Sequence, residues 1–158
     1  MKKEILYTAF KGKTNSSKVL LDNINSQDKL YLTNSFVTSV TELEQALKKK
    51  HYDLIISFGQ AFLDLDTIQI ETLAQIEDNV LKTNYEYLKL KKDLEKEYKV
   101  VISETASNYL CNNIYYHGLR IIKENNYKTN IIFIHIPKLE NISNIVSLAN
   151  IFNNLNLK

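Results

Sequence analysis

The chain contains a single cysteine, Cys111, whose surroundings suit thiol chemistry. His135 follows in a short apolar run, residues 131–136, and Glu71 lies upstream in the segment TIQIETLAQ. A thiolate can attack a carbonyl carbon, an imidazole can carry the proton, and a carboxylate can hold that imidazole in one tautomer. If the fold brings these three side chains together, the reaction they fit is acyl transfer through sulfur.

The residues before Cys111 predict a reactive thiol. Thr105, Ser107 and Asn108 can each cap the start of a helix, which would place the sulfur in the first helical turn. Unpaired amide N–H groups and the positive end of the helix dipole would then favour the thiolate and could form an oxyanion hole. Reactive cysteines in such settings have pKa values of roughly 3.5 to 7.5, so we expect fast alkylation of Cys111 by iodoacetamide at neutral pH.

Strand and helix patterns alternate along the chain. Strands are predicted at residues 3–10, 29–33, 53–58, 67–70, 99–103 and 131–136, and helices at residues 41–50, 84–98, 108–125 and 142–155. The strands at 53–58 and 131–136 are mostly apolar, as is typical of strands covered on both faces. The sequence therefore predicts a three-layer α/β/α sandwich with a mostly parallel or mixed central sheet.

Composition limits the class of protein. A chain of 158 residues with 44% hydrophobic content suits one domain, residues 1–158, with a core that needs no disulfide. The single cysteine and the lack of a signal-like apolar run at the start predict a cytoplasmic protein. No apolar stretch approaches the roughly 20 residues that span a bilayer, so we expect no membrane segment.

Charge and metal-ligand patterns exclude further classes. The formal net charge is only +2, and Arg120 is the single arginine, which argues against nucleic-acid binding. One cysteine and scattered histidines, among them His51 and His117, do not have zinc-ligand spacing. We therefore expect no zinc site.

Four blocks, in chain order, resemble pyroglutamyl peptidase I, a family of cysteine peptidases that removes N-terminal pyroglutamate from peptides. The blocks are ILYTAFKGKTNSS, DLIISFGQA, IQIETLA, and the pair SETASNYLCN and FIHIP. The resemblance implies an α/β/α fold with Cys111 as nucleophile, His135 as proton carrier and Glu71 as its anchor. It further implies peptide substrates with N-terminal pyroglutamate, no cofactor, Phe10 and Gln60 at the substrate, and either a monomer or a homo-oligomer.

Departures from the family pattern support other hypotheses. The stretch between Glu71 and Cys111 is shorter than is usual in the family, and the first loop lacks a second aromatic residue. A family member that has lost activity and acts as a binding or assembly module is the second hypothesis, and a peptidase with another N-terminal preference is the third. Gln60 could equally end a strand and bond a loop, and an inward-pointing Glu104 would oppose formation of the thiolate.

Overall fold

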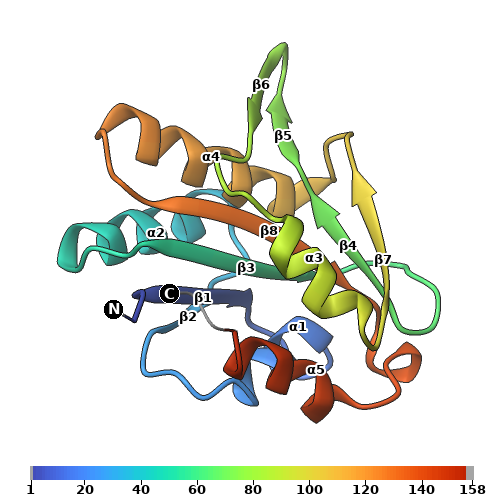
Figure 1. The fold of residues 1–158 in the computed structure, drawn as a ribbon. Helices are drawn as coiled ribbons and strands as arrows, with labels where there is room; N and C mark the ends of the chain where they lie inside the picture. The colour runs from blue at the N-terminus through green and yellow to red at the C-terminus, as the bar shows by residue number, and fades with distance from the viewer. Residues whose placement is uncertain (1, 156–158) are drawn as a thin grey trace.

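A six-stranded sheet forms the centre of the computed structural model, which describes residues 2–155 (Figure 1). The strands are β1 (Ile5–Phe10), β2 (Lys29–Leu32), β3 (Leu54–Gln60), β4 (Thr67–Glu71), β7 (Lys99–Ser103) and β8 (Asn130–Ile136). They lie in the order β2-β1-β3-β8-β4-β7. Neighbouring strands are parallel except for β4 and β8, which are antiparallel, so the sheet is mixed.

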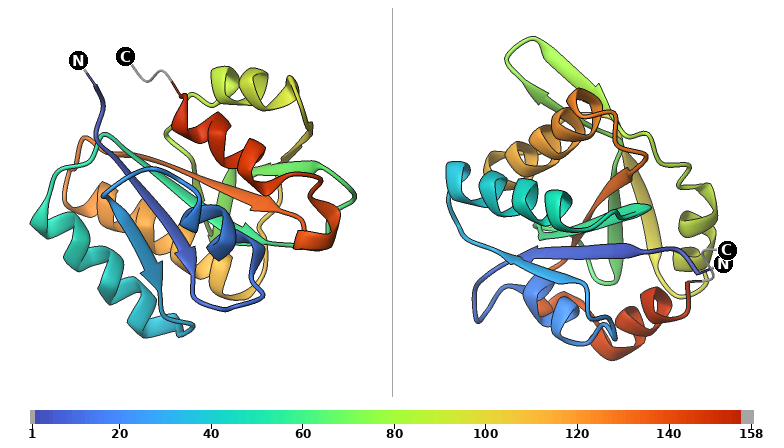
Figure 2. Two further views of the ribbon diagram at one scale, coloured as in Figure 1. Left: turned by 90° about the horizontal axis from the view of Figure 1, so that it is seen from below. Right: turned by 90° about the vertical axis from the view of Figure 1, so that its left-hand side faces the viewer.

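Helices cover both faces of this sheet (Figures 1 and 2). One face carries α1 (Ser16–Asp22), α3 (Leu88–Glu95) and α5 (Ile145–Asn153), and the other carries α2 (Phe36–Lys49) and α4 (Tyr109–Glu124). Strands β3 and β8 lie in the middle of the sheet, and almost every residue in them is buried. The three-layer α/β/α sandwich predicted from the sequence is confirmed.

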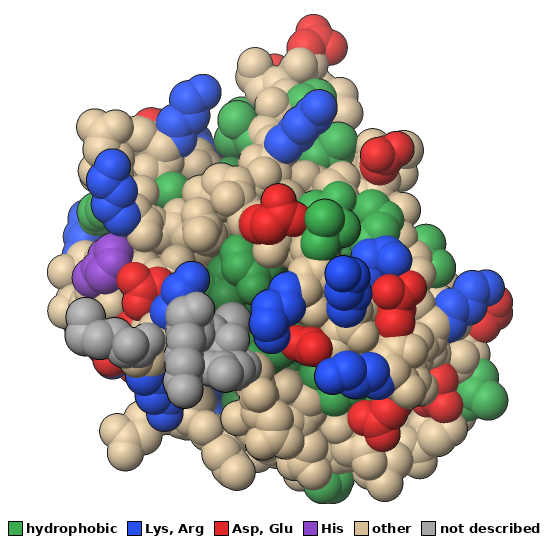
Figure 3. Space-filling model, in the orientation of Figure 1, with side chains coloured by type: hydrophobic (Ala, Val, Ile, Leu, Met, Phe, Trp, Pro, Cys, Tyr) green, Lys and Arg blue, Asp and Glu red, His purple; other side chains and the backbone are tan. Residues whose placement is uncertain are grey.

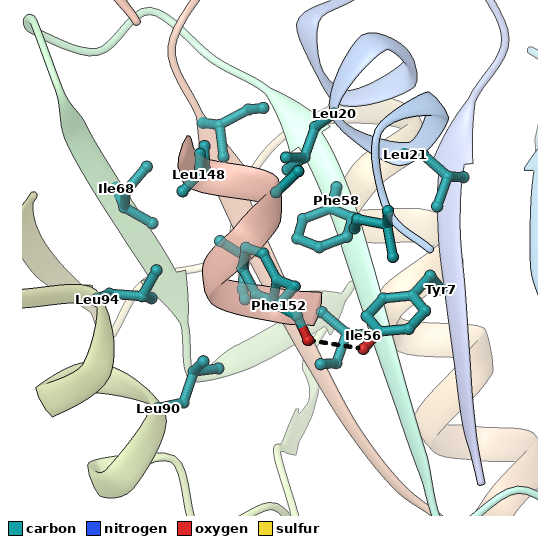
Figure 4. Close-up of a cluster of buried hydrophobic side chains, with 14 of the residues drawn as sticks. Tyr7, Leu20, Leu21, Ile56, Phe58, Ile68, Leu90, Leu94, Leu148 and Phe152 are labelled. Atoms are coloured by element: carbon teal, nitrogen blue, oxygen red, sulfur yellow. Dashed lines mark hydrogen bonds between the residues drawn. The ribbon is translucent and has the colours of Figure 1, made fainter. Parts of the chain in front are cut away.

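The face under α1, α3 and α5 carries an apolar core (Figure 4). The rings of Phe58 and Phe152 meet edge to face with centroids 4.9 Å apart, which joins β3 to α5. The hydroxyl of Tyr7 reaches the backbone oxygen of Phe152 at 3.5 Å. These contacts attach α5 to the sheet on the face opposite Glu71 and His135.

The face under α2 and α4 combines a core with buried polar residues. Phe10, Tyr115 and Phe133 belong to its apolar cluster, and Cys111 packs against that cluster. Glu71 and His135 are also buried on this side of the sheet. The chemistry expected from the sequence is therefore concentrated on one face.

The six predicted strands and four predicted helices are all present, but a short helix, a hairpin and the 3-10 helix η1 (Leu139–Asn141) were missed. Helix α1 has only seven residues, and its N-terminal side-chain cap, Asn15, lies in a polar stretch that resembles a loop. The hairpin of β5 (Leu73–Ile76) and β6 (Asn79–Lys82) projects beyond the sheet (Figure 1). It lies between Glu71 and Cys111, in the stretch that looked shortened.

The surface shows no segregation of charge on the side drawn in Figure 3, where lysines alternate with acidic side chains. Three lysine–carboxylate pairs on helices have i,i+4 spacing, which is common on solvated helix faces. Within residues 2–155, no helix is both long enough and apolar enough to cross a bilayer.

Candidate active site

The candidate site lies near the carboxyl ends of two parallel central strands. Gly59 of β3 and His135 of β8 are register partners, and both strands end at the next residue. Ligands bind preferentially at such strand ends in open α/β sheets. The first turn of α4 covers this point and brings Cys111 to it.

His135 is held by a buried carboxylate. Its Nδ1 lies 3.0 Å from Oε2 of Glu71, and the two side chains are only 6% and 1% exposed. Strand β4 runs antiparallel to β8 and pairs Glu71 with Phe133, so the carboxylate points to the same face as the imidazole. With Nδ1 facing Glu71, Nε2 is the nitrogen left for proton transfer.

The sulfur of Cys111 sits directly over Gly59. A Cβ atom built on Gly59 would lie 2.7 Å from this sulfur and 2.9 Å from the ring of Phe133. Only a residue without a side chain leaves room for the sulfur there. Gly59 and His135 are partners on adjacent strands, so the sulfur of α4 that lies over Gly59 is on the same face of the sheet as the imidazole.

Cys111 and His135 do not hydrogen-bond to each other directly within the described part of the chain. Hydrogen bonds of a catalytic pair are often long without substrate and tighten in the complex. The geometry therefore brings together the three residues that the sequence singled out, with the Glu71–His135 contact formed and the thiol–imidazole contact open.

The two side chains that follow Cys111 fix the first turns of α4. The amide of Asn112 accepts from the backbone N–H of Gln75 at 3.0 Å and donates to its carbonyl at 2.7 Å. Asn113 donates to the carbonyl of Phe36 at 3.0 Å. The helix start is thus joined to β5 on one side and to α2 on the other, which restricts where the sulfur can move.

The helix begins where the sequence predicted but without a side-chain cap. Asn108 is the N-cap residue and makes no capping hydrogen bond, and Tyr109 has a left-handed φ of 58°. A left-handed conformation is uncommon for a tyrosine and is typically found at functional sites or tight turns. The first-turn amides therefore have no capping side chain and can serve as donors to an oxyanion.

The state of the thiol differs from the prediction. Burial raises the pKa of Cys111 to about 12, and the negative charge of Glu71 adds to the increase. The sequence showed the helix start but not how deeply the sulfur is buried. Glu104, the carboxylate that seemed able to oppose the thiolate, is exposed, so Glu71 is the carboxylate that does so.

The raised pKa leads to a prediction about alkylation. We expect the rate of Cys111 alkylation by iodoacetamide to rise about tenfold per pH unit from pH 7 to pH 9, because only the thiolate reacts and its fraction stays small throughout. Mass spectrometry of the peptide containing Cys111 measures this rate without interference, since no other cysteine is present. Glutathione serves as the reference thiol, and a plateau for Cys111 below pH 8 would show a preformed thiolate instead.

Tyr115 couples the helix that carries Cys111 to the strand that carries Glu71. It lies one helical turn after Cys111 on α4, and its hydroxyl donates to the backbone oxygen of Glu71 at 2.8 Å. The ring also packs against Phe133, with centroids 5.7 Å apart. This contact sets the separation between the sulfur and the Glu71–His135 pair.

Replacing Tyr115 by phenylalanine is expected to lower the free energy of unfolding by about 1–2 kcal/mol, because a buried hydrogen bond is lost. Urea denaturation measures the change. Tyr116→Phe is the matched control, since the hydroxyl of Tyr116 makes no hydrogen bond within residues 2–155. Equal stability of the two variants would contradict a coupling role for the Tyr115 hydroxyl.

The two residues expected at the substrate have structural contacts. Phe10 ends β1, is 4% exposed and packs in the cluster that also supports Cys111. The side-chain oxygen of Gln60 accepts from the backbone N–H of Ser16 at 2.8 Å, at the first residue of α1. Because side chains alternate along β3, Gln60 points to the face under α1, whereas Cys111 lies over Gly59 on the other face. This favours the interpretation that Gln60 ends the strand over direct contact with substrate.

Some residues of the site had no clear signal in the sequence. Gln69 donates to Oε2 of Glu71 at 2.6 Å, and its position two residues earlier on the same strand was the one available hint. The close approach at Gly59, the anchoring by Asn112 and the Tyr115 contact all depend on pairings distant in the sequence. None of these follows from local patterns.

Comparisons with known proteins identify the fold. No protein-family model and no curated protein matches the chain. Among solved structures, pyroglutamyl peptidase I from Bacillus amyloliquefaciens superposes with a TM-score of 0.81 at 19% identity, over 96% of this chain and 95% of that one. The chain has the fold of pyroglutamyl peptidase I.

Two further structures support the same assignment of fold. Pyrrolidone carboxyl peptidase from Fervidobacterium islandicum gives a TM-score of 0.75 at 22% identity, over 86% of this chain and 81% of that one. A mutant pyrrolidone carboxyl peptidase from Pyrococcus furiosus gives a TM-score of 0.69 at 25% identity, over 84% of this chain and 80% of that one. The resemblance to pyroglutamyl peptidase I drawn from short sequence blocks is therefore confirmed by three-dimensional similarity along most of the chain.

Proposed function

We propose that this protein is a cysteine exopeptidase that removes N-terminal pyroglutamate from peptides through a thioester on Cys111. The observation that carries the proposal is the buried pair of Glu71 and His135, 3.0 Å apart, on the face where the Cys111 sulfur lies over Gly59. A nucleophile, a base and an orienting acid in one place are the parts that acyl transfer requires. Similarity of fold to pyroglutamyl peptidases supports the choice of substrate.

The proposed reaction begins with a protonated thiol, because the pKa of Cys111 is raised. Nε2 of His135 takes the thiol proton as the sulfur attacks the carbonyl carbon that joins pyroglutamate to the next residue. The carbonyl oxygen becomes an oxyanion, which the first-turn amides of α4 stabilise. Glu71 stabilises the imidazolium that forms and keeps Nδ1 protonated.

The C–N bond then breaks, and the departing amine takes the proton from His135. A pyroglutamyl thioester remains on Cys111. His135 next removes a proton from water, which attacks the thioester, and pyroglutamate leaves as the sulfur recovers its proton. Apart from the substrate and this water, the proposed cycle uses only groups of the chain.

The substrate's lactam ring is compact and uncharged, so an apolar pocket with a few directed hydrogen bonds suits it. In this proposal Phe10 contributes to the apolar cluster against which Cys111 packs, and Gln60 acts by holding the start of α1. Cys111 is a free cysteine, which suits a reducing compartment such as the cytoplasm.

Hydrolysis of a pyroglutamyl-coumarin amide by the purified protein tests the proposal. We expect release of the coumarin amine by the wild type, none above background by Cys111→Ala, and little hydrolysis of alanyl or glutaminyl amides. Turnover of the other aminoacyl amides with none of the pyroglutamyl compound would indicate a different N-terminal preference.

A second candidate is a member of the same fold that has lost peptidase activity and acts as a binding or assembly module. The observation that favours it is the raised pKa of the buried Cys111 thiol, since buried structural cysteines are usually inert. Wild-type turnover equal to that of Cys111→Ala, with both proteins folded, would select this candidate.

A further inference from the structure

Gln69 occupies a special position beside the candidate site. It lies on β4 two residues before Glu71, so the two side chains point to the same face. It is also the direct cross-strand partner of His135 on β8. Gln69 therefore borders both members of the buried pair, although the proposed reaction assigns it no role.

The hydrogen bonds at Glu71 are unevenly distributed. Oε2 receives the Gln69 amide at 2.6 Å and faces His135 Nδ1 at 3.0 Å. Oε1 is buried and has no hydrogen-bond partner within residues 2–155. Both hydrogen bonds of the carboxylate are therefore made by Oε2. Gln69 is one of the two groups that fix the orientation of the carboxylate relative to the imidazole.

The chemistry of an amide makes this contact directional. The NH₂ group of glutamine can only donate, and an ionised carboxylate can only accept. Oε2 accepts from Gln69 and is oriented by this bond to accept from Nδ1–H of His135 as well, which keeps the proton of the pair on Nδ1. A proton on Nδ1 leaves Nε2 unprotonated and able to act as a base.

We propose that Gln69 is a positioning residue, whose amide fixes the Glu71 carboxylate so that His135 keeps its proton on Nδ1 and presents Nε2 to the thiol. The consequence for catalysis rests on the proposed peptidase function. The consequence for the imidazole tautomer does not, because it follows from the contacts of Gln69, Glu71 and His135 alone.

The kinetic test replaces Gln69 by methionine, which has a similar shape but no donor. We expect kcat for the pyroglutamyl-coumarin amide to fall about tenfold, the usual effect of losing a hydrogen bond to a charged group, while KM stays within about twofold. Gln45→Met, at an exposed position on α2, is the matched control and should keep the wild-type kcat. Gln69→Thr, which suits a strand, replaces the methionine variant if that variant does not fold.

The structural test uses nitrogen NMR of protein labelled in its histidines, with the His135 signals assigned by their loss in His135→Ala. We expect a protonated Nδ1 in the wild type and a mixture of tautomers in Gln69→Met. A wild-type His135 protonated mainly on Nε2 would overturn the proposal without any variant. An unchanged tautomer together with an unchanged kcat in the folded variant would also overturn it, and an inactive wild type with the expected tautomer would reject only the peptidase function.

Discussion

Replacing Glu71 by glutamine is expected to lower kcat for the pyroglutamyl-coumarin amide by about 10⁴-fold with little change in KM. The isosteric amide removes the negative charge that stabilises the His135 imidazolium. Its NH₂ group can also donate to Nδ1, which would put the proton of the neutral ring on Nε2 and block proton transfer from the thiol. Loss of the anchoring carboxylate in a Ser-His-Asp site has an effect of this size.

Glu104→Gln is the control for this experiment. Glu104 lies closer to Cys111 in the sequence than Glu71 does, but its side chain is exposed. We expect it to keep wild-type kcat and KM. A Glu71→Gln variant that folds and stays within a few fold of wild-type kcat would remove Glu71 from the proposed reaction.

A methyl group at Gly59 is expected to disturb both the fold and the reaction. In Gly59→Ala the new Cβ would lie 2.7 Å from the Cys111 sulfur and 2.9 Å from the Phe133 ring, so the sulfur or the ring must move. Overpacking of this kind typically costs about 1–3 kcal/mol in the free energy of unfolding. Displacing a nucleophile by about 1 Å costs about 100-fold in rate, and we expect a fall in kcat of that order.

Gly118→Ala separates the two effects. A Cβ on Gly118 would lie 2.8 Å from Cδ1 of Ile131 and 3.4 Å from Cδ2 of Leu43, which is crowding at a similar distance on the helix that carries Cys111, but away from the sulfur. We expect urea denaturation to show a loss of stability in both variants and kinetics to show a large loss of kcat only in Gly59→Ala. Equal kcat values in the two would place the sulfur elsewhere during the reaction.

Much of the fold follows from local patterns. The apolar runs that became β3 and β8 predict strands covered on both faces, and the structure buries them in the middle of the sheet. The lysines that end α2 and the apolar spacing of α4 mark helices correctly. What the sequence did not indicate was the reversal of β4 against β8, because strand direction depends on pairing between distant segments.

The candidate site was predictable in its residue types but not in its electrostatics. Glu71, Cys111 and His135 could be named from chain order and block similarity, and the fold places them on one face. The pKa of the thiol could not be predicted, because it depends on how far α4 buries the sulfur and on the distance to the Glu71 charge. Gln60 shows the same limit, since its role depended on which face of β3 it occupies.

The central claim is that the Cys111 sulfur carries the pyroglutamyl group between two half-reactions. Turnover of the pyroglutamyl-coumarin amide quenched in acid, followed by digestion and mass spectrometry, tests it directly. We predict a peptide containing Cys111 that is heavier by one pyroglutamyl group, and its absence in His135→Ala. Continued release of the coumarin amine with Cys111 alkylated, or with the acyl group on another residue, would contradict the account.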